Sequence, residues 1–349
     1  MARISYPVMG NYSVAAYYLL SNVLDDEVIK PPDITKKTVE IGTRYSPEFV
    51  CSPFKYTLGT LMESLELGAD TLLQMGGGCR YGYYHELQEK VLKDMGFSFK
   101  LINLVSGGRS IPLKSLLNDY GLHVKKISFP RYFFITKKMI SYIDCIEDYI
   151  RKHRCCEKNK GAFDSLERKM LDDFANSKGY FSLRKLYKKY DQEFKNIELD
   201  ETIRPLKVGL VGELYTLMEP GSNHNIEAML SEKGVSITRY INVTYLLFKK
   251  KRSIKRYLKN FFIKYPMGAD ALDNIYHTKY FCENGYDGII HIKSSFCTPE
   301  ISAMPIIESL GQQYDVPIIF FSMDMNTSKT GVQTRIDAFC DMLEMRREH

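Results

Sequence analysis

Short apolar runs alternate with longer amphipathic segments through the first hundred residues of the chain. The runs have the length of buried strands and lie at residues 4–8, 27–30, 70–75 and 99–104. The segments between them have helical periodicity and lie at residues 13–24, 53–67 and 81–95. Because strands that alternate with helices are typical of a parallel sheet with crossover helices, an α/β domain is predicted over residues 1–141.

The pattern changes after that domain and then returns. Residues 142–203 are heavily charged, have helical periodicity and contain no strand-like run, so a helical excursion is expected there. Beyond it, strands are predicted at 207–211, 235–242, 287–293 and 316–322, and helices up to 233, at 299–312 and near 335–345. Residues 204–349 therefore read as a second α/β domain. A chain of 349 residues exceeds what one core usually supports, and we expect two doubly wound, Rossmann- or flavodoxin-like parallel sheets.

The two predicted domains contain similar segments. Gly68-Ala-Asp70-Thr-Leu-Leu-Gln-Met leads to Cys79 and a helix, and Gly285-Tyr-Asp287-Gly-Ile-Ile-His-Ile leads to Cys297 and a helix. In both, the cysteine follows the carboxyl end of a strand, where open α/β sheets place their ligands. A chance likeness between two βαβ units is the alternative reading.

Three cysteines lie in loops at predicted helix N-termini. The loops are Cys51-Ser-Pro-Phe-Lys, Gly76-Gly-Gly-Cys79-Arg-Tyr-Gly and Ser294-Ser-Phe-Cys297-Thr-Pro-Glu. Thiolates at such positions suit an anionic metal cluster, because exposed backbone N–H groups and the helix dipole offset its charge. The chain has no Cys-x-x-Cys, and inert buried cysteines are the alternative that spacing alone leaves open.

The remaining cysteines have other surroundings. Cys340 lies inside an apolar helical period and is expected in the core. Cys155-Cys156 is expected on a solvated helix surface, and Cys282 near a helix end is a candidate fourth ligand. Eight cysteines in a chain of this length are too sparse for a disulfide scaffold.

Charge and hydropathy limit the function further. The net charge of +6 permits an anionic ligand without requiring nucleic acid. No run approaches the roughly 20 apolar residues of a membrane span, and a cytoplasmic protein is expected. The basic segment 249–262 has the charge to attract CoA phosphates, an acidic redox partner or an anionic membrane surface, or it forms a solvated helix face.

Several segments together resemble a known family. They are Cys51-Ser-Pro-Phe-Lys-Tyr-Thr-Leu-Gly, Gly78-Cys-Arg-Tyr-Gly-Tyr-Tyr-His-Glu-Leu-Gln, Val208-Gly-Leu-Val-Gly-Glu-Leu-Tyr, Phe296-Cys-Thr-Pro-Glu-Ile and Thr334-Arg-Ile-Asp-Ala-Phe. The chain resembles the iron–sulfur subunits of 2-hydroxyacyl-CoA dehydratases, and in particular the branch related to CoA-substrate-specific enzyme activases. This resemblance covers nearly the whole chain.

The resemblance implies a cofactor, a partner and a reaction. Cys51, Cys79 and Cys297 would bind one [4Fe–4S] cluster in the interdomain cleft and leave one iron without a cysteine. An ATP-hydrolysing activator with its own [4Fe–4S] cluster would deliver a low-potential electron, which in the dehydratases forms a ketyl radical on an acyl-CoA that then loses its hydroxyl. A non-catalytic electron relay or cluster carrier is the alternative.

The chain also departs from the dehydratase pattern. Dehydratases are pairs of unlike subunits, whereas this is one chain, and a homodimer is one possible assembly. The acidic stretch of many relatives reads Met323-Asp-Met-Asn-Thr here. Dehydratase activity therefore follows less directly from these residues than cluster binding does.

Further residues are predicted to serve the same site. Gly76-Gly77-Gly78 lacks the Gly-Lys-Ser/Thr ending of a P-loop and is expected to wrap the cluster sulfides, with Ser295 contacting the same cofactor. Arg80 is expected beside the cluster, where it contacts substrate or a neighbouring carboxylate. Glu213 follows a predicted strand and either transfers protons or caps the next loop.

Overall fold

The chain forms two compact units. The structure is a computed structural model that describes residues 1–74, 79–106, 109–110, 122, 124–125, 129–246 and 267–348. Unit 1 comprises Met1–Ile140 and Leu171–Arg184, and unit 2 comprises Ser141–Met170 and Lys185–His349.

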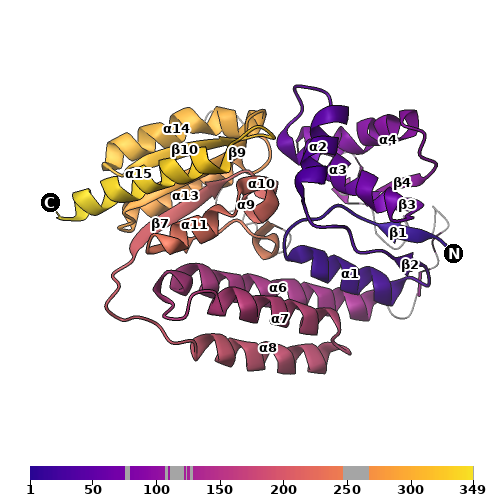
Figure 1. The fold of residues 1–349 in the computed structure, drawn as a ribbon, viewed down its shortest axis with the longest axis horizontal. Coiled ribbons are helices and arrows are strands. Elements are labelled where there is room, and N and C mark those ends of the chain that lie inside the picture. Colours follow the sequence, from indigo (N-terminus) through magenta and orange to yellow (C-terminus); the bar gives the residue numbers. More distant parts are fainter. Residues whose placement is uncertain are drawn as a thin grey trace. The chain divides into compact units, whose positions relative to one another are not determined.

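Unit 1 is built on a four-stranded parallel sheet in the order β2-β1-β3-β4. The strands are β1 (Arg3–Ser5), β2 (Glu27–Val28), β3 (Thr71–Gln74) and β4 (Lys100–Asn103). The helices of the α/β part are α1 (Tyr12–Val23), α2 (Lys36–Tyr45), α3 (Ser52–Glu66) and α4 (Tyr84–Asp94), and a short antiparallel pair, β5 (Val105–Ser106) and β6 (Arg109–Ser110), follows (Figure 1).

Alternating side chains of this sheet enter two apolar clusters. Leu73 and Ile102 pack with α1 on one face, whereas Leu72 and Leu101 pack with α3 and α4 on the other. Successive residues of a strand point to opposite faces, so near-continuous apolar strands are buried on both sides. This is why short apolar runs with little alternation mark these strands in the sequence.

Helices α2 and α3 approach each other closely through two glycines. A Cβ on Gly42 would lie 2.3 Å from the carbonyl oxygen of Lys55, and a Cβ on Gly59 would lie 2.4 Å from that of Thr38. Neither position can carry a side chain without moving the facing helix. The two glycines therefore fix the position of α3 against α2. The helix α2 was not predicted from the sequence pattern.

Unit 2 has a second four-stranded parallel sheet, in the order β10-β9-β7-β8. Its strands are β7 (Leu206–Gly212), β8 (Val235–Thr238), β9 (Gly288–Ser294) and β10 (Ile318–Met323). Its main helices are α11 (Ile226–Glu232), α13 (Ala271–Glu283), α14 (Thr298–Tyr314) and α15 (Lys329–Glu348), with the short α9 (Leu214–Met218) and α10 (Pro220–Asn223) after β7. Phe281 of α13 packs on Gly209, and Phe339 and Leu343 of α15 pack on Gly288.

Both sheets have the same topology. In each unit the first strand lies between the second and the third, and the fourth lies beyond the third. This order is that of flavodoxin-like sheets, whose ligands bind where the strand order reverses, at the carboxyl ends of the first and third strands. The two predicted doubly wound sheets are confirmed.

The similar segments of the two halves occupy equivalent places. Asp70, before β3, accepts a hydrogen bond at 2.9 Å from the backbone N–H of Arg3 in β1. Asp287, before β9, accepts one at 2.6 Å from the N–H of Lys207 in β7. In both units an aspartate thus aligns the third strand with the first, which gives the sequence likeness a structural cause.

The charged middle of the chain is helical. It contains α6 (Phe129–His153), η2 (Arg154–Cys156), α7 (Ala162–Ala175) and α8 (Tyr180–Lys195). The predicted helical excursion is thus observed, and its first helix begins before residue 142. Residues of α6, α7 and α8 contribute to both compact units.

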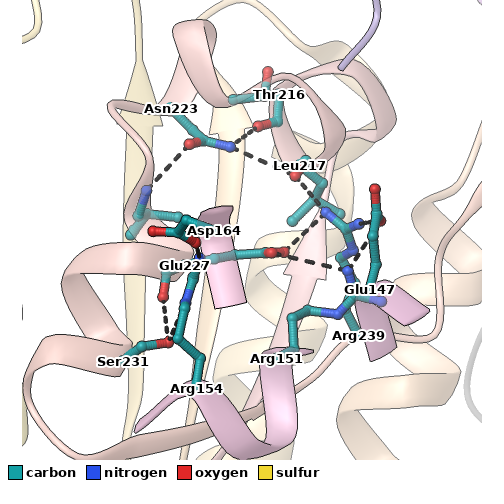
Figure 2. Close-up of polar contacts among 11 residues, drawn as sticks. Glu147, Arg151, Arg154, Asp164, Thr216, Leu217, Asn223, Glu227, Ser231 and Arg239 are labelled. Carbon is teal, nitrogen blue, oxygen red and sulfur yellow. Dashed lines mark hydrogen bonds and ion pairs between the residues drawn. The ribbon is translucent and has the colours of Figure 1, made fainter. Parts of the chain in front are cut away.

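Within unit 2, buried ion pairs join this helical segment to the α/β core (Figure 2). Arg151 of α6 and Arg239 after β8 are only 2% and 3% exposed. Arg151 lies 3.2 Å from the carboxylate of Glu147, and Arg239 lies 3.4 Å from the same group and 2.9 Å from Glu227. Removing one partner of such a pair leaves a buried charge uncompensated, so these contacts hold α6 against α11.

A third arginine and two more carboxyl groups complete this arginine–carboxylate cluster. Arg154 pairs with Asp164 of α7 at 2.9 Å and donates to Ser231 of α11 (Figure 2). Glu167 lies among these carboxylates, and burial together with their negative charge raises its pKa to about 8. Three arginines then face three charged carboxylates and one protonated Glu167, which leaves the cluster neutral.

The raised pKa of Glu167 predicts a pH dependence of stability. Between about 4.3, the pKa of an exposed glutamate, and about 8, the folded protein binds a proton that the unfolded chain has lost. The free energy of unfolding therefore decreases as pH rises through this range, and Glu167→Gln removes that decrease. Urea unfolding of both proteins from pH 5 to 8.5 measures it.

The exposed Glu201 supplies the control. Glu201→Gln should keep the wild-type decrease in unfolding free energy between pH 5 and 8.5. If Glu167→Gln also kept it, the carboxyl group would be ionised in the folded protein, contrary to the neutral cluster.

Candidate functional site

Cys51 lies at the carboxyl edge of the unit 1 sheet. It is the N-cap of α3, with Pro53 in the first turn of the helix. The helix α3 returns the chain to the start of the parallel strand β3. Its N-terminus therefore lies at the opposite edge of the sheet, where the strands end. Its sulfur is 2.9 Å from the hydroxyl of Tyr84, the first residue of α4.

Cys79 follows β3 at the same edge. It is the N-cap of η1 (Arg80–Tyr83), which leads directly into α4, and its side chain is partly exposed. Gly76, Gly77 and Gly78 lie outside the described residues. The contact between Cys51 and Tyr84 therefore links the first turn of α3 to the helical segment that Cys79 begins.

A buried amide network fixes this arrangement. Gln88 of α4 donates to the hydroxyl of Thr57 at 2.7 Å and to the carbonyl of Phe54 at 3.2 Å, both in α3. Gln74, the last residue of β3, donates to the Gln88 carbonyl at 2.6 Å. Both glutamines are almost wholly buried, so one side chain connects the three elements that carry Cys51 and Cys79. In the sequence, the only sign of this network was one polar residue, Gln88, among the apolar positions of a helix.

Arg80 lies close enough to act on the same tyrosine. Burial raises the pKa of Tyr84, the neighbouring Cys51 raises it further, and the positive charge of Arg80 opposes the shift. Arg80 itself is exposed. The segment from Cys79 to Tyr84 thus combines the thiol of Cys79, the cation of Arg80 and the neutral phenol of Tyr84.

Cys297 occupies the equivalent place in unit 2. It follows β9, caps α14 and is 8% exposed. Lys293 of β9 is also buried, and its pKa is lowered by burial, while the nearby Cys297 and Glu300 oppose that change. Ser295 donates its backbone N–H to Met323 at 3.0 Å and its hydroxyl to Asp324 at 3.4 Å, which joins the Cys297 loop to the end of β10.

A second buried network holds α14. Glu300, in its first turn, accepts from His291 of β9 at 2.8 Å and from the Asn274 amide of α13 at 2.9 Å. Asn274 also pairs with both backbone groups of Gly212, the last residue of β7. The helix that begins at Cys297 is therefore fixed to β7 and β9, the strands that flank the switch point.

Glu213 follows Gly212 at that switch point. Its carboxylate accepts from the backbone N–H groups of Tyr215 and Thr216 at 2.9 and 3.0 Å, and so caps α9. Burial raises the pKa of Glu213, and the charge of Glu300 contributes to the rise. From the sequence, Glu213 was expected either to transfer protons or to cap the next loop. The contacts of its carboxylate are those of a helix cap.

Three of the other cysteines, Cys155, Cys282 and Cys340, have surroundings that disfavour the thiolate. Cys282 packs with Phe281 and Ile289, and burial raises its pKa to about 11. Burial also raises the pKa of Cys340 to about 11. The prediction of an exposed Cys155 was wrong: it is 1% exposed, and its pKa is raised to about 12, because the helix ends in η2 and turns it inward.

The described residues contain neither a ready-made metal site nor a disulfide. Among the described residues, no group of three or more His, Cys, Asp or Glu is arranged to hold a metal ion. All eight cysteines are described, and none forms a disulfide. In the same part of the chain, no helix is long and apolar enough to cross a bilayer. The basic segment 249–262 lies outside the described residues.

The amide network of unit 1 generates a stability prediction. Gln88→Leu keeps a side chain of similar size but removes the buried hydrogen bonds that Gln88 makes with Gln74, Thr57 and the Phe54 carbonyl. A buried group that loses its hydrogen bond costs about 1–3 kcal/mol, and we expect the free energy of unfolding to fall by at least that amount. Urea unfolding checks this, with Gln312→Leu at an exposed helical position as control. Equal stability of the two variants would contradict the role given to Gln88.

A known family model matches part of unit 2. Residues 214–343 match the family model described as 2-hydroxyglutaryl-CoA dehydratase, D-component. The matched segment runs from α9 through Cys297 and α14 into α15. A search of the curated proteins found no match. Residues 214–343 of unit 2 are thus similar to this component of the 2-hydroxyacyl-CoA dehydratases.

Proposed function

We propose that the chain binds one [4Fe–4S] cluster through Cys51 and Cys79 of unit 1 and Cys297 of unit 2. The observation that carries this proposal is the shared position of the three thiols. Each caps a helical segment at the carboxyl edge of a parallel sheet, and the two sheets have the same strand order. The family match over residues 214–343 supports the same cofactor.

The donor set suits an iron–sulfur cluster. Thiolates are the soft ligands that such clusters take, and a disulfide among them would prevent binding. None of the three thiols forms a disulfide, and backbone N–H groups at the helical N-termini favour an anion beside them. Lys293 lies near Cys297, and a thiolate there would favour the charged form of this lysine.

We infer low-potential reductive chemistry on an acyl-CoA or another small molecule. A [4Fe–4S] cluster with three cysteine ligands supplies a low-potential electron and leaves one iron without a protein ligand. Arg80, exposed at the start of η1, is suited to bind an anionic part of the substrate. Glu213 has a raised pKa and is suited to hold a proton for a leaving hydroxyl.

The proposed electron donor is an ATP-dependent activator protein with its own [4Fe–4S] cluster. The family match over residues 214–343 supports this partner, because the 2-hydroxyacyl-CoA dehydratases receive their electron from such an activator. In the alternative function, a non-catalytic relay, the chain would pass that electron to another enzyme.

Iron content tests cluster binding. Protein purified and reconstituted without oxygen should hold about four irons per chain. Cys79→Ser should lose most of that iron, because serine replaces a ligand thiolate. Cys340→Ser, at a buried cysteine of α15, is the matched control and should keep it. Iron-free wild-type protein, or equal iron in the two variants, would contradict the proposed ligands.

The same samples distinguish an enzyme from a relay. An open iron accepts a substrate group, so adding a 2-hydroxyacyl-CoA should change the electron paramagnetic resonance spectrum of the reduced protein. A spectrum that stays unchanged at saturating acyl-CoA favours the relay.

A further inference from the structure

We propose that Tyr84 is a positioning residue that sets the reduction potential of the cluster by donating a hydrogen bond to the sulfur of Cys51. This inference rests on the proposed function, because it requires Cys51 to be a cluster ligand.

The geometry holds the Tyr84 hydroxyl against the sulfur. The oxygen and the Cys51 sulfur are 2.9 Å apart. The Tyr84 ring is 6% exposed and packs edge-on against Phe54, with centroids 4.9 Å apart and planes at 88°. Tyr81 covers it from another side, with centroids 5.3 Å apart. A ring confined in this way has little freedom to turn its hydroxyl away from the cysteine.

The direction of the hydrogen bond follows from the chemistry of a ligand thiolate. A cysteine that binds iron has lost its proton, so only the phenol can donate. A tyrosine hydroxyl has an ordinary pKa of about 10, so the phenol keeps its proton at neutral pH. A neutral O–H beside a thiolate makes a charge-assisted hydrogen bond.

Such a bond acts on the potential through charge. Reduction adds one negative charge to the cluster and its thiolates, and a hydrogen-bond donor stabilises that charge more in the reduced state than in the oxidised state. Hydrogen bonds to the sulfurs are among the factors that set the potentials of iron–sulfur proteins. Tyr84 therefore makes the cluster easier to reduce by its activator.

The Gln88 network makes this effect specific to Tyr84. Gln88 connects α4 to Phe54 and Thr57 of α3, so the two helices that carry the tyrosine and the cysteine are fixed to each other. Removing the hydroxyl alone leaves this connection and the packed ring in place. Tyr84→Phe therefore deletes a hydrogen bond without opening a cavity.

The test compares Tyr84→Phe with Tyr83→Phe, which removes a neighbouring hydroxyl whose side chain is 69% exposed. Each protein is reconstituted without oxygen, its iron is counted, and its midpoint potential is measured by redox titration followed by electron paramagnetic resonance. We expect the Tyr84→Phe cluster to have a more negative potential than the wild type, and the Tyr83→Phe cluster to match the wild type.

A second measurement detects the hydrogen bond itself. After exchange into deuterated water, electron–nuclear double resonance of the reduced wild type and Tyr83→Phe should show an exchangeable deuteron coupled to the cluster. That signal should be missing from Tyr84→Phe. Circular dichroism and thermal unfolding confirm that the variants are folded.

The outcomes separate this inference from the proposed function. If all three proteins hold about four irons and have the same potential and deuteron signals, the role of Tyr84 is overturned and cluster binding stands. If the wild type holds no iron, both fall. If Tyr84→Phe folds but loses iron while Tyr83→Phe keeps it, the hydrogen bond from the Tyr84 hydroxyl is needed to keep Cys51 bound to the cluster. That result supports the contact between Tyr84 and Cys51.

Discussion

The structure depends on one constraint: parallel strands end at a common edge, and the helices that return the chain begin there. In both units this edge gathers strand ends and helix N-termini, whose backbone N–H groups have no partner within the helix. Cys51, Cys79 and Cys297 are all placed at such positions. An anionic cofactor would be stabilised there by the backbone alone, and this supports the proposal that these three cysteines bind it.

Buried polar side chains then make that edge rigid. Unit 1 uses the neutral amide of Gln88 to connect α3, α4 and β3, whereas unit 2 uses the carboxylate of Glu300 with His291 and Asn274 to connect α14 to its strands. Each network lies behind a cysteine loop and is almost wholly buried. Cluster ligands must keep their geometry through electron transfer, and satisfied buried hydrogen bonds favour one arrangement over its alternatives.

Much of this architecture could be predicted from the sequence, because buried parallel strands leave continuous apolar runs. The strands before Cys79 and Cys297 were predicted to within a residue or two of their ends. The helix α2 was missed because it packs mainly against one other helix, α3. Its sequence carries a glycine, Gly42, that allows this close approach, instead of a long apolar period. The burial of Cys155 and the arginine–carboxylate cluster were also missed, since charge compensation between distant segments leaves no periodicity in the sequence.

The central claim is that three cysteines from two units of one chain bind a single cluster. Anomalous diffraction at the iron absorption edge, from crystals grown without oxygen, tests it most directly. The account predicts one compact iron peak per chain, with the sulfurs of Cys51, Cys79 and Cys297 all bonded to it. Iron bound by another set of cysteines, or by cysteines of one unit alone, would contradict the account.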